Sequence, residues 1–313
     1  MLNRLVVFAH DANSANITIA YIFFYGKLYE AIDIYCDGPA KEIFKRDYSS
    51  YIKEFSSLKF FQTDTVISGT SGLYSSYEMS MIKNAKIAGV QKTITLIDNI
   101  ANFEKRFILD GKLIDLEYLA DEIWIDTIKS FKSDIPQIAS KSIIKENFYK
   151  SYLKVFFQKF PPKQSHNFIK DHKGEYLLIL TEYIYELYRL QFGFTEYEMV
   201  ENILETIDAL DLKIPIFLKL HPYESKNKFN ILLRKYSHLQ IIQDNCNSQD
   251  LIFYSKVVFG ISSSLFKECS LFQKPTFSIQ INSNKTIVVE NIPNNHKIYS
   301  QKHLSVILKK YFL

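Results

Sequence analysis

Short runs of β-branched and aromatic residues alternate with segments of helical spacing along this chain, and each apolar run stops at polar or turn-forming residues. In the first half the runs cover residues 5–9, 31–36, 65–68, 92–97 and 122–125. Helical segments lie between them, at residues 15–25, at 74–88 and from residue 41 onward. Because parallel strands are joined by crossover helices, this rhythm predicts a parallel sheet covered by helices on both faces.

A polar, turn-rich segment at residues 161–174 interrupts the rhythm. The pattern then resumes, with runs at residues 176–180, 214–220, 239–243, 257–260 and 276–279 and helical segments at 197–210 and 264–272. At 313 residues the chain is long enough for two domains. We therefore predict an α/β protein of two Rossmann-like domains facing a central cleft, residues 1–160 and 175–313, joined by a linker at about 161–174.

Composition excludes several classes of function. The net charge of +4, from 38 basic and 34 acidic residues, is too small for a nucleic-acid groove, so no nucleic-acid partner is expected. Cys36, Cys246 and Cys269 show neither metal-ligand spacing nor a paired framework, which favours a reducing, cytoplasmic location. Neither Gly-x-Gly-x-x-Gly after a strand nor a zinc-like cluster occurs, so no cofactor and no metal are expected.

The two ends of the chain bear on membrane association. The first residues are too short in apolar length for a signal peptide and predict a strand. No apolar run approaches the roughly 20 residues that a spanning helix needs. Residues 302–313 mix lysine with apolar residues, which predicts an amphipathic helix packed on the body of the protein. Peripheral association with the inner membrane is the alternative.

His221 and Pro222 follow the predicted strand at 214–220. Proline removes a backbone donor and ends the strand. Ligands of open α/β sheets bind beyond the carboxyl ends of strands, so an imidazole here could donate a hydrogen bond to a phosphate or a ribose hydroxyl. The alternative is a histidine that bonds only the local backbone.

Three serines, Ser262, Ser263 and Ser264, follow the predicted strand at 257–260 and precede a predicted helix. Hydroxyls and backbone N–H groups at a helix start suit an anionic phosphate. The alternative for any one serine is a simple N-cap. Glu268, one turn into the helix, could accept hydrogen bonds from a ribose diol, or it could be a solvated helix residue.

Two loops of the first half are candidates for binding a sugar donor or acceptor. One follows the first strand and the other follows the strand at 65–68, before a helix that contains Glu78. Small and polar residues after a strand allow close approach of a ligand. Turn and cap roles are the alternative. The candidate residues are His10, Asp11, Asn13, Ser14, Asn16, Gly69, Thr70 and Ser71.

Asp98 ends the predicted strand at 92–97 and could act as a general base toward an attacking hydroxyl. Asn102 and Arg106 lie further along, and the guanidinium of Arg106 could bind a substrate carboxylate in a bidentate manner. Alternatively, Asp98 caps the next helix and Arg106 lies on the surface.

These motifs resemble those of GT-B glycosyltransferases, in particular bacterial CMP-sugar-dependent sialyltransferases, polysialyltransferases and Kdo transferases. Those families have a His-Pro after a second-lobe strand and a serine pair before a helix, as in His221-Pro222 and Ser262–Ser264. The resemblance implies that His221 and the serines hold the CMP phosphate, and that a first-lobe aspartate, here Asp98, is the base. The first-lobe loops are also similar to those of bacterial surface-polysaccharide proteins.

The resemblance therefore implies an inverting, metal-independent glycosyltransferase. It would move an acidic sugar, a nonulosonate or Kdo, from a CMP-sugar to a glycan or glycolipid acceptor, with stabilisation of the leaving CMP phosphate as the main catalytic effect. Three alternatives remain open at this stage: a polyol-phosphate transferase using CDP-glycerol, a UDP-sugar 2-epimerase, and a sugar-nucleotide binding protein without catalysis.

Overall fold

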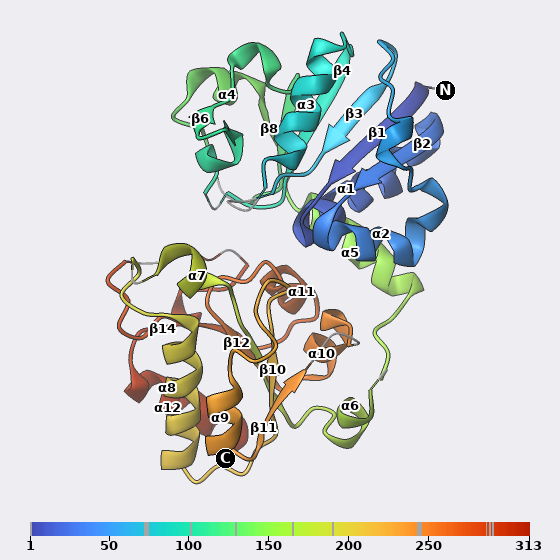
Figure 1. Ribbon diagram of the computed structural model, residues 1–313. Coiled ribbons are helices and arrows are strands. Elements are labelled where there is room, and N and C mark those ends of the chain that lie inside the picture. The colour runs from blue at the N-terminus through green and yellow to red at the C-terminus, as the bar shows by residue number, and fades with distance from the viewer. Residues whose placement is uncertain are drawn as a thin grey trace. The chain divides into compact units, whose positions relative to one another are not determined.

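The computed structural model describes residues 2–71, 75–100, 102–128, 130–164, 166–189, 191–242, 246–285, 287, 289 and 291–313. The chain forms two compact units, Met1–Phe156 and Phe157–Leu313, and each contains a six-stranded sheet (Figure 1). The division falls inside helix α5 (Phe148–Lys159), a few residues before the turn-rich segment of the sequence.

The sheet of the first unit runs in the order β2-β1-β3-β4-β7-β8, and its described strand pairs are parallel. Its strands are β1 (Leu2–Ala9), β2 (Tyr29–Cys36), β3 (Thr65–Ser68), β4 (Lys92–Ile97), β7 (Glu122–Ile125) and β8 (Ser142–Ile144). From β1 the chain turns to β2 on one side and then to β3 on the other. Ligands of open α/β sheets bind beyond the strand ends at such a reversal, which here lies between β1 and β3.

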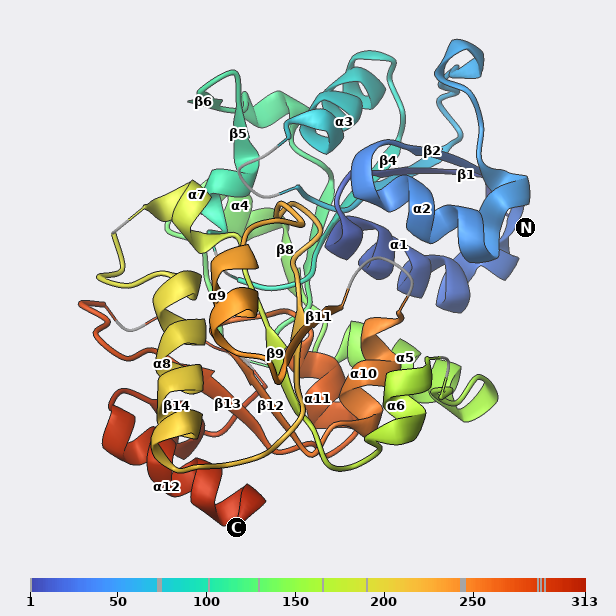
Figure 2. The same cartoon turned by 60° about the horizontal axis from the view of Figure 1, so that its bottom comes forward.

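Helices cover both faces of this sheet. Phe8 packs in one cluster with Ile82 of α3 (Tyr77–Ile87). Alternate strand residues point to opposite faces, so the buried Val7 faces the side that α1 (Ala12–Tyr25) covers. Figure 2 shows α1 and α3 on opposite sides of the strands. The other elements of this unit are α2 (Gly38–Tyr48), the antiparallel pair β5 (Ile108–Leu109) and β6 (Lys112–Leu113), and α4 (Pro136–Lys141).

The sheet of the second unit runs in the order β11-β10-β9-β12-β13-β14, again with parallel pairs. Its strands are β9 (Leu177–Leu180), β10 (Ile216–Lys219), β11 (Leu239–Ile242), β12 (Val257–Gly260), β13 (Thr276–Ile279) and β14 (Lys297–Ile298). The order of the strands reverses between β9 and β12. The candidate ligand edge of this unit is therefore the carboxyl end of β9 and its two neighbours.

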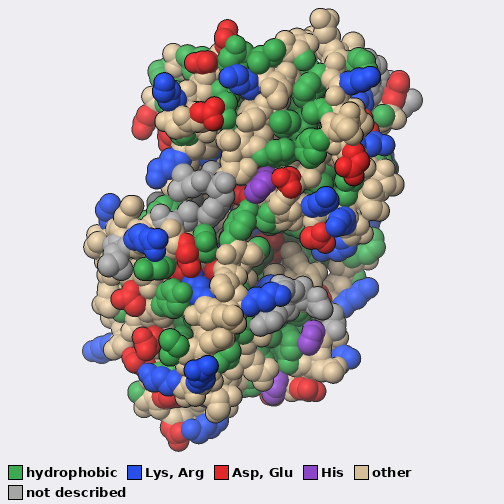
Figure 3. Space-filling model, in the orientation of Figure 1, with side chains coloured by type: hydrophobic (Ala, Val, Ile, Leu, Met, Phe, Trp, Pro, Cys, Tyr) green, Lys and Arg blue, Asp and Glu red, His purple; other side chains and the backbone are tan. Residues whose placement is uncertain are grey.

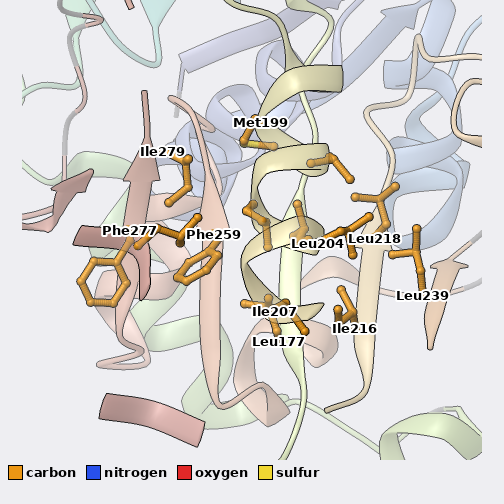
Figure 4. Packing of buried hydrophobic residues seen from close by; sticks show 14 of the residues in the cluster. Leu177, Met199, Leu204, Ile207, Ile216, Leu218, Leu239, Phe259, Phe277 and Ile279 are labelled. Atoms are coloured by element: carbon orange, nitrogen blue, oxygen red, sulfur yellow. The ribbon is translucent and has the colours of Figure 1, made fainter. Parts of the chain in front are cut away.

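The core of the second unit forms where α8 (Glu196–Ala209) packs on the sheet. Figure 4 shows Ile207 of this helix next to Leu177 of β9, with Leu204 further along the same side of the helix. The helix begins at a capping box, in which the Thr195 side chain and Glu198 bond each other's backbone amides. The other helices are α6 (Asn167–Asp171), α7 (Ile184–Tyr188), α9 (Asn230–Lys235), α10 (Ser248–Tyr254), α11 (Phe266–Leu271) and α12 (Gln301–Phe312).

The C-terminal helix α12 packs its apolar side into this core through Leu304, Ile307 and Leu308. Across the described residues, every helix is too short or too polar to span a membrane. On the face drawn in Figure 3, basic and acidic side chains are interspersed and not gathered by sign. This distribution matches the small net charge of the sequence.

Gly69 allows α1 to approach the end of β3. A Cβ added to Gly69 would lie 2.5 Å from the Cα of Ser14, which real carbon atoms do not tolerate. We expect Gly69→Ala to lower the free energy of unfolding by about 1–3 kcal/mol, the usual cost of overpacking. Urea denaturation measures this change.

Gly174→Ala is the matched control for this prediction. Position 174 has a φ of +75°, but an added Cβ would meet nothing within 4 Å. Its cost should be limited to backbone strain of about 1 kcal/mol. Wild-type stability of Gly69→Ala would contradict the steric argument.

Candidate functional site

The carboxyl edge of the second sheet brings together residues that are far apart in the sequence. The strands β10, β9 and β12 are neighbours in that order, and His221, Glu182 and Ser262 each follow their strand by two positions. Two of the residue groups predicted from the sequence, His221 and the serines, therefore follow the strands on either side of β9. Glu182, which follows β9 itself, was missed, although it occupies the same position after its strand as His221 does.

The Glu182 carboxylate holds the loop after β12. Its Oε1 accepts hydrogen bonds from the amides of Ile261 at 2.9 Å and Ser262 at 2.6 Å, and its Oε2 accepts from the Ser262 hydroxyl at 2.6 Å. Burial raises the pKa of Glu182, and these donors oppose that shift. The protein's own carboxylate thus occupies the amide and the hydroxyl of Ser262, a residue that the sequence analysis assigned to a phosphate.

The serines also lie outside the helix that they were expected to begin. The helix α11 starts at Phe266, and its N-cap position, Leu265, has no side-chain cap bond. The Ser263 hydroxyl instead accepts a hydrogen bond from the amide of Leu265 at 3.3 Å. A phosphate contact at Ser263 and Ser264 therefore stays a prediction that rests on their hydroxyls. The helix has only six residues and begins after the serines, so its dipole contributes little at their position.

The backbone and ring of His221 are both oriented by neighbours. Its amide donates to Glu224 Oε2 at 2.7 Å, and its Nδ1 accepts from the amide of Tyr223 at 3.3 Å. An imidazole that accepts at Nδ1 carries its proton on Nε2, so the ring presents a donor. The rings of Tyr183 and Tyr223 lie beside it, with centroids 6.4 and 5.6 Å away. Pro222 follows, as expected from the sequence.

A buried ion cluster supports this edge. The Lys228 ammonium lies 2.7 Å from Glu224 and 3.0 Å from Glu186, and it also contacts Glu196. Glu224 additionally accepts from the hydroxyl of Thr181. The sequence analysis did not single out this cluster. The sequence indicates it only through the spacing of four residues between Glu224 and Lys228, which have opposite charges.

Burial and pairing set the protonation of this cluster. Removal from water raises the pKa of Glu224 and of Glu196. Burial alone would lower the pKa of Lys228, but its bonds to Glu196 and Glu224 outweigh burial and raise it above the ordinary 10.5. Lys228 is therefore charged and neutralises carboxylates that could not be buried without it.

Glu268 is buried in α11, with 2% of its surface exposed. This burial excludes the solvated-helix interpretation. Contact with a ribose diol stays a prediction.

In the first unit, Glu78 ties together the two strand ends at the reversal. This carboxylate is buried, and its pKa is raised by burial. It accepts from the amide of His10 at 2.8 Å and from the hydroxyl of Ser71 at 2.7 Å. The ring of His10 is held in turn by Asp11, with 2.8 Å between Nδ1 and Oδ1. His10, Asp11 and Ser71 therefore belong to one connected group.

Arg106 links the ends of β3 and β4. Its Nη1 donates to Asp98 Oδ1 at 2.9 Å and to the Thr70 hydroxyl at 2.7 Å, and its Nη2 donates to Asn99 Oδ1 at 3.0 Å. Asn99 also donates to Asp98 Oδ2 at 2.6 Å. Arg106 is mostly buried, so the surface alternative is excluded. Its charge neutralises Asp98. Asn102, which lies between the two residues in the sequence, has a φ of +51°.

The remaining candidates lie inside a helix. Asn13, Ser14 and Asn16 belong to the first turns of α1, which starts at Ala12, where the sequence had suggested a loop over 11–14. Ser14 is buried against Gly69. Among the described residues, no group of three or more His, Cys, Asp or Glu could hold a metal ion.

Comparisons with known proteins establish the fold. The sequence matches no protein-family model and no curated protein. Its structure is similar to the UDP-GlcNAc 2-epimerase of Methanocaldococcus jannaschii in complex with UDP-GlcNAc and UDP (TM-score 0.61, 12% identity, 99% of this chain and 92% of that one). It is also similar to the UDP-GlcNAc 2-epimerase of Neisseria meningitidis bound to UDP-GlcNAc (0.59, 13%, 98% and 91%). A third similar structure is S. aureus MnaA with UDP (0.61, 11%, 99% and 88%).

These likenesses confirm the GT-B fold and correct the expected activity. The similar structures hold uridine nucleotides, and two of them are epimerases. The CMP-sugar glycosyltransferase, its CMP-activated acidic sugar donor and its glycan or glycolipid acceptor are therefore wrong. The physical reason is that a histidine and serine hydroxyls recognise a phosphate, which CMP-sugars and UDP-sugars share.

The buried cluster predicts a large effect of Lys228→Met. Removing one partner of a buried ion pair usually costs about 3–5 kcal/mol, and we expect a loss of this size in the free energy of unfolding at neutral pH. Without the ammonium the folded-state pKa of Glu196 and Glu224 rises further. The unfolded chains of both proteins titrate alike, so the deficit should grow as the pH rises through the folded-state pKa of these glutamates in the wild type, which is already raised above 4.5, and should shrink below it.

Lys235→Met provides the control, because Lys235 pairs with Glu201 and Glu205 at 3.7 and 3.8 Å on the surface. Its denaturation midpoint should change little at any pH. Equal effects of the two substitutions would contradict the cluster's role.

Proposed function

We propose that this protein binds a UDP-sugar and inverts the configuration at C2 of its hexosamine, as a 2-epimerase does. The observation that carries the proposal is the likeness along 98–99% of the chain to structures that hold UDP or UDP-GlcNAc. The identity is 11–13%, so the likeness gives the fold, and the site residues must support the chemistry on their own.

The carboxyl edge of the second sheet supports the binding of a nucleoside diphosphate. The Nε2–H of His221 is a donor directed by the bond at Nδ1. The hydroxyls of Ser263 and Ser264 supply further donors, and Glu268 is a carboxylate acceptor suited to a ribose diol. This combination of donors for phosphate and an acceptor for ribose is what a nucleotide requires.

Inversion at C2 breaks the C2–H bond and forms a new one on the opposite face of the sugar. The reaction needs proton-transferring side chains and no second substrate. Among the residues predicted from the sequence, His221 is the candidate group at the nucleotide edge of the second sheet. An epimerase would therefore turn over without any glycan acceptor, which separates this proposal from a transferase.

The decisive experiment is incubation of the protein with UDP-GlcNAc in D₂O, without an acceptor. We expect the proton signal at C2 to disappear as deuterium enters from solvent, and a second UDP-hexosamine to accumulate. Proton NMR follows both changes. Heat-denatured protein is the control. A folded protein that leaves the C2 proton in place would sink the proposal.

Nucleotide affinity tests the binding site separately. We expect UDP to raise the thermal midpoint more than CMP, GDP or ADP at equal concentration, because a ligand that binds only the folded state stabilises it by mass action. His221→Gln should weaken UDP binding about 10- to 100-fold, the usual effect of losing a hydrogen bond to a charged group.

His238→Gln is the matched control for His221→Gln. His238 immediately precedes β11, so it lies at the opposite, amino edge of the same sheet. Stronger stabilisation by CMP than by UDP, or equal binding by both variants, would count against the assigned nucleotide site.

A further inference from the structure

The Ser262 hydroxyl, one of the groups predicted to contact a phosphate, is engaged by a carboxylate of the protein. Glu182 Oε2 lies 2.6 Å from Ser262 Oγ. An ionised carboxylate can only accept hydrogen bonds, and a hydroxyl has a single hydrogen, so Ser262 is the donor of this bond. While Glu182 is ionised, the Ser262 side chain therefore cannot also donate to a phosphate.

The other oxygen of Glu182 is held independently of this hydroxyl. Its Oε1 accepts from the amides of Ile261 at 2.9 Å and Ser262 at 2.6 Å. A protonated carboxyl group keeps its carbonyl oxygen as an acceptor, so these two bonds persist in either protonation state. Protonation therefore leaves the loop after β12 in place. It changes only the direction of the bond between Oε2 and the Ser262 hydroxyl.

Glu182 follows the strand that lies between the two predicted phosphate contacts. It comes two positions after β9, and the neighbouring strands β10 and β12 lead to His221 and Ser262 at the same spacing. A diphosphate bound beyond these strand ends would bring its charge close to the Glu182 carboxylate. A nearby anion disfavours the ionised form of a carboxyl group.

The unliganded protein already holds Glu182 close to protonation. Burial is the main cause that raises the pKa of Glu182, its hydrogen bonds oppose burial, and the charge of Glu224 raises the pKa further. Glu224 is held at the preceding position, because it accepts from the hydroxyl of Thr181. The charge of a phosphate would act in the same direction as that of Glu224.

We propose that Glu182 takes up a proton when a nucleotide binds, and that this proton reverses its hydrogen bond with Ser262, an inference that rests on the proposed binding of a UDP-sugar at this edge. The proton comes from solvent, and no covalent bond between heavy atoms changes. Oε2–H then donates to Ser262 Oγ, and the Ser262 hydrogen turns to a phosphate oxygen. Glu182 acts through Ser262 and is therefore a positioning residue. Nucleotide affinity is greatest below the pKa of Glu182 in the unliganded protein and declines as the pH rises through it.

Glu182→Gln tests the proposal, because a carboxamide reproduces the protonated carboxyl group. Its oxygen accepts from the two amides, and its N–H donates to Ser262 Oγ. We expect this variant to bind UDP about 10-fold more tightly than the wild type at about pH 8, the usual gain from one hydrogen bond to a charged group. The ratio of the wild-type Kd to the variant Kd should fall toward one as the pH is lowered to about 5. Isothermal titration calorimetry measures both constants.

The ratio isolates Glu182 from the other groups that titrate. Protonation of UDP itself and of the neighbouring side chains contributes to both dissociation constants and leaves their ratio unchanged. The ionisable side chains on the elements around this edge include those of Glu186, His221, Glu224, Lys228, Lys267 and Glu268.

Glu175→Gln is the matched control. Glu175 precedes β9 by two positions, so it lies at the opposite, amino edge of the same strand, and it is exposed. Its Kd for UDP should equal that of the wild type at every pH.

Ser262→Ala tests the hydrogen-bond reversal itself. With this substitution in the background, Glu182→Gln should no longer tighten UDP binding, because the hydroxyl that turns to the phosphate is gone. Alone, Ser262→Ala should weaken binding about 10-fold at low pH and little at about pH 8, where Glu182 already engages the hydroxyl. Should Glu182→Gln fail to fold, this pH dependence decides the question.

The outcomes separate this inference from the proposed function. A ratio that does not change with pH, weaker UDP binding by Glu182→Gln, or a gain that persists without the Ser262 hydroxyl would overturn the role of Glu182 and leave the nucleotide site standing. Absence of C2 exchange together with the expected change of the ratio would overturn the epimerase activity alone. Absence of UDP binding by every protein would overturn both.

Discussion

A buried carboxylate must find hydrogen-bond donors, and this requirement shapes the ligand edge of both sheets. Three glutamates, of which Glu78 and Glu224 are buried and Glu182 is partly buried, each accept a hydrogen bond from a backbone amide just after a strand. Glu78 holds His10, Glu224 holds His221, and Glu182 holds Ser262. In every case the anchored residue is one that the sequence analysis had selected for chemistry. The glutamates therefore position the candidate residues within each unit, and removal of any of them would leave backbone amides without their partners.

The same constraint explains the buried ammonium of Lys228. Glu224 cannot be buried as an ion without a counter-charge, and Lys228 supplies one while also meeting Glu196 and Glu186. The cluster thus links α8, through Glu196, to the loop that carries His221. In the first unit, Arg106 does the equivalent for Asp98, and the role of Asp98 as a base stays a prediction.

The expectation of a CMP-sugar failed because of what each residue type can recognise. A histidine and serine hydroxyls after two strands identify a phosphate, and every nucleotide-sugar has one. The identity of the base and of the sugar depends on contacts that these motifs do not contain. The resemblance to CMP-dependent transferases therefore led to the right fold and the wrong donor.

The sequence by itself determined the two parallel sheets, because the alternation of apolar runs and helical spacing is a local property. It also determined which strand ends carry His10, Asp98, His221 and the serines, since those residues directly follow the runs. Only the tertiary structure decided which of these residues are hydrogen-bonded to which carboxylates. Glu78 lies 68 residues from His10, and Glu182 lies 80 residues from Ser262. No local sequence pattern predicts such pairs. Which residues pair depends on the order of the strands in the sheet and on the need of buried charges for hydrogen-bond partners.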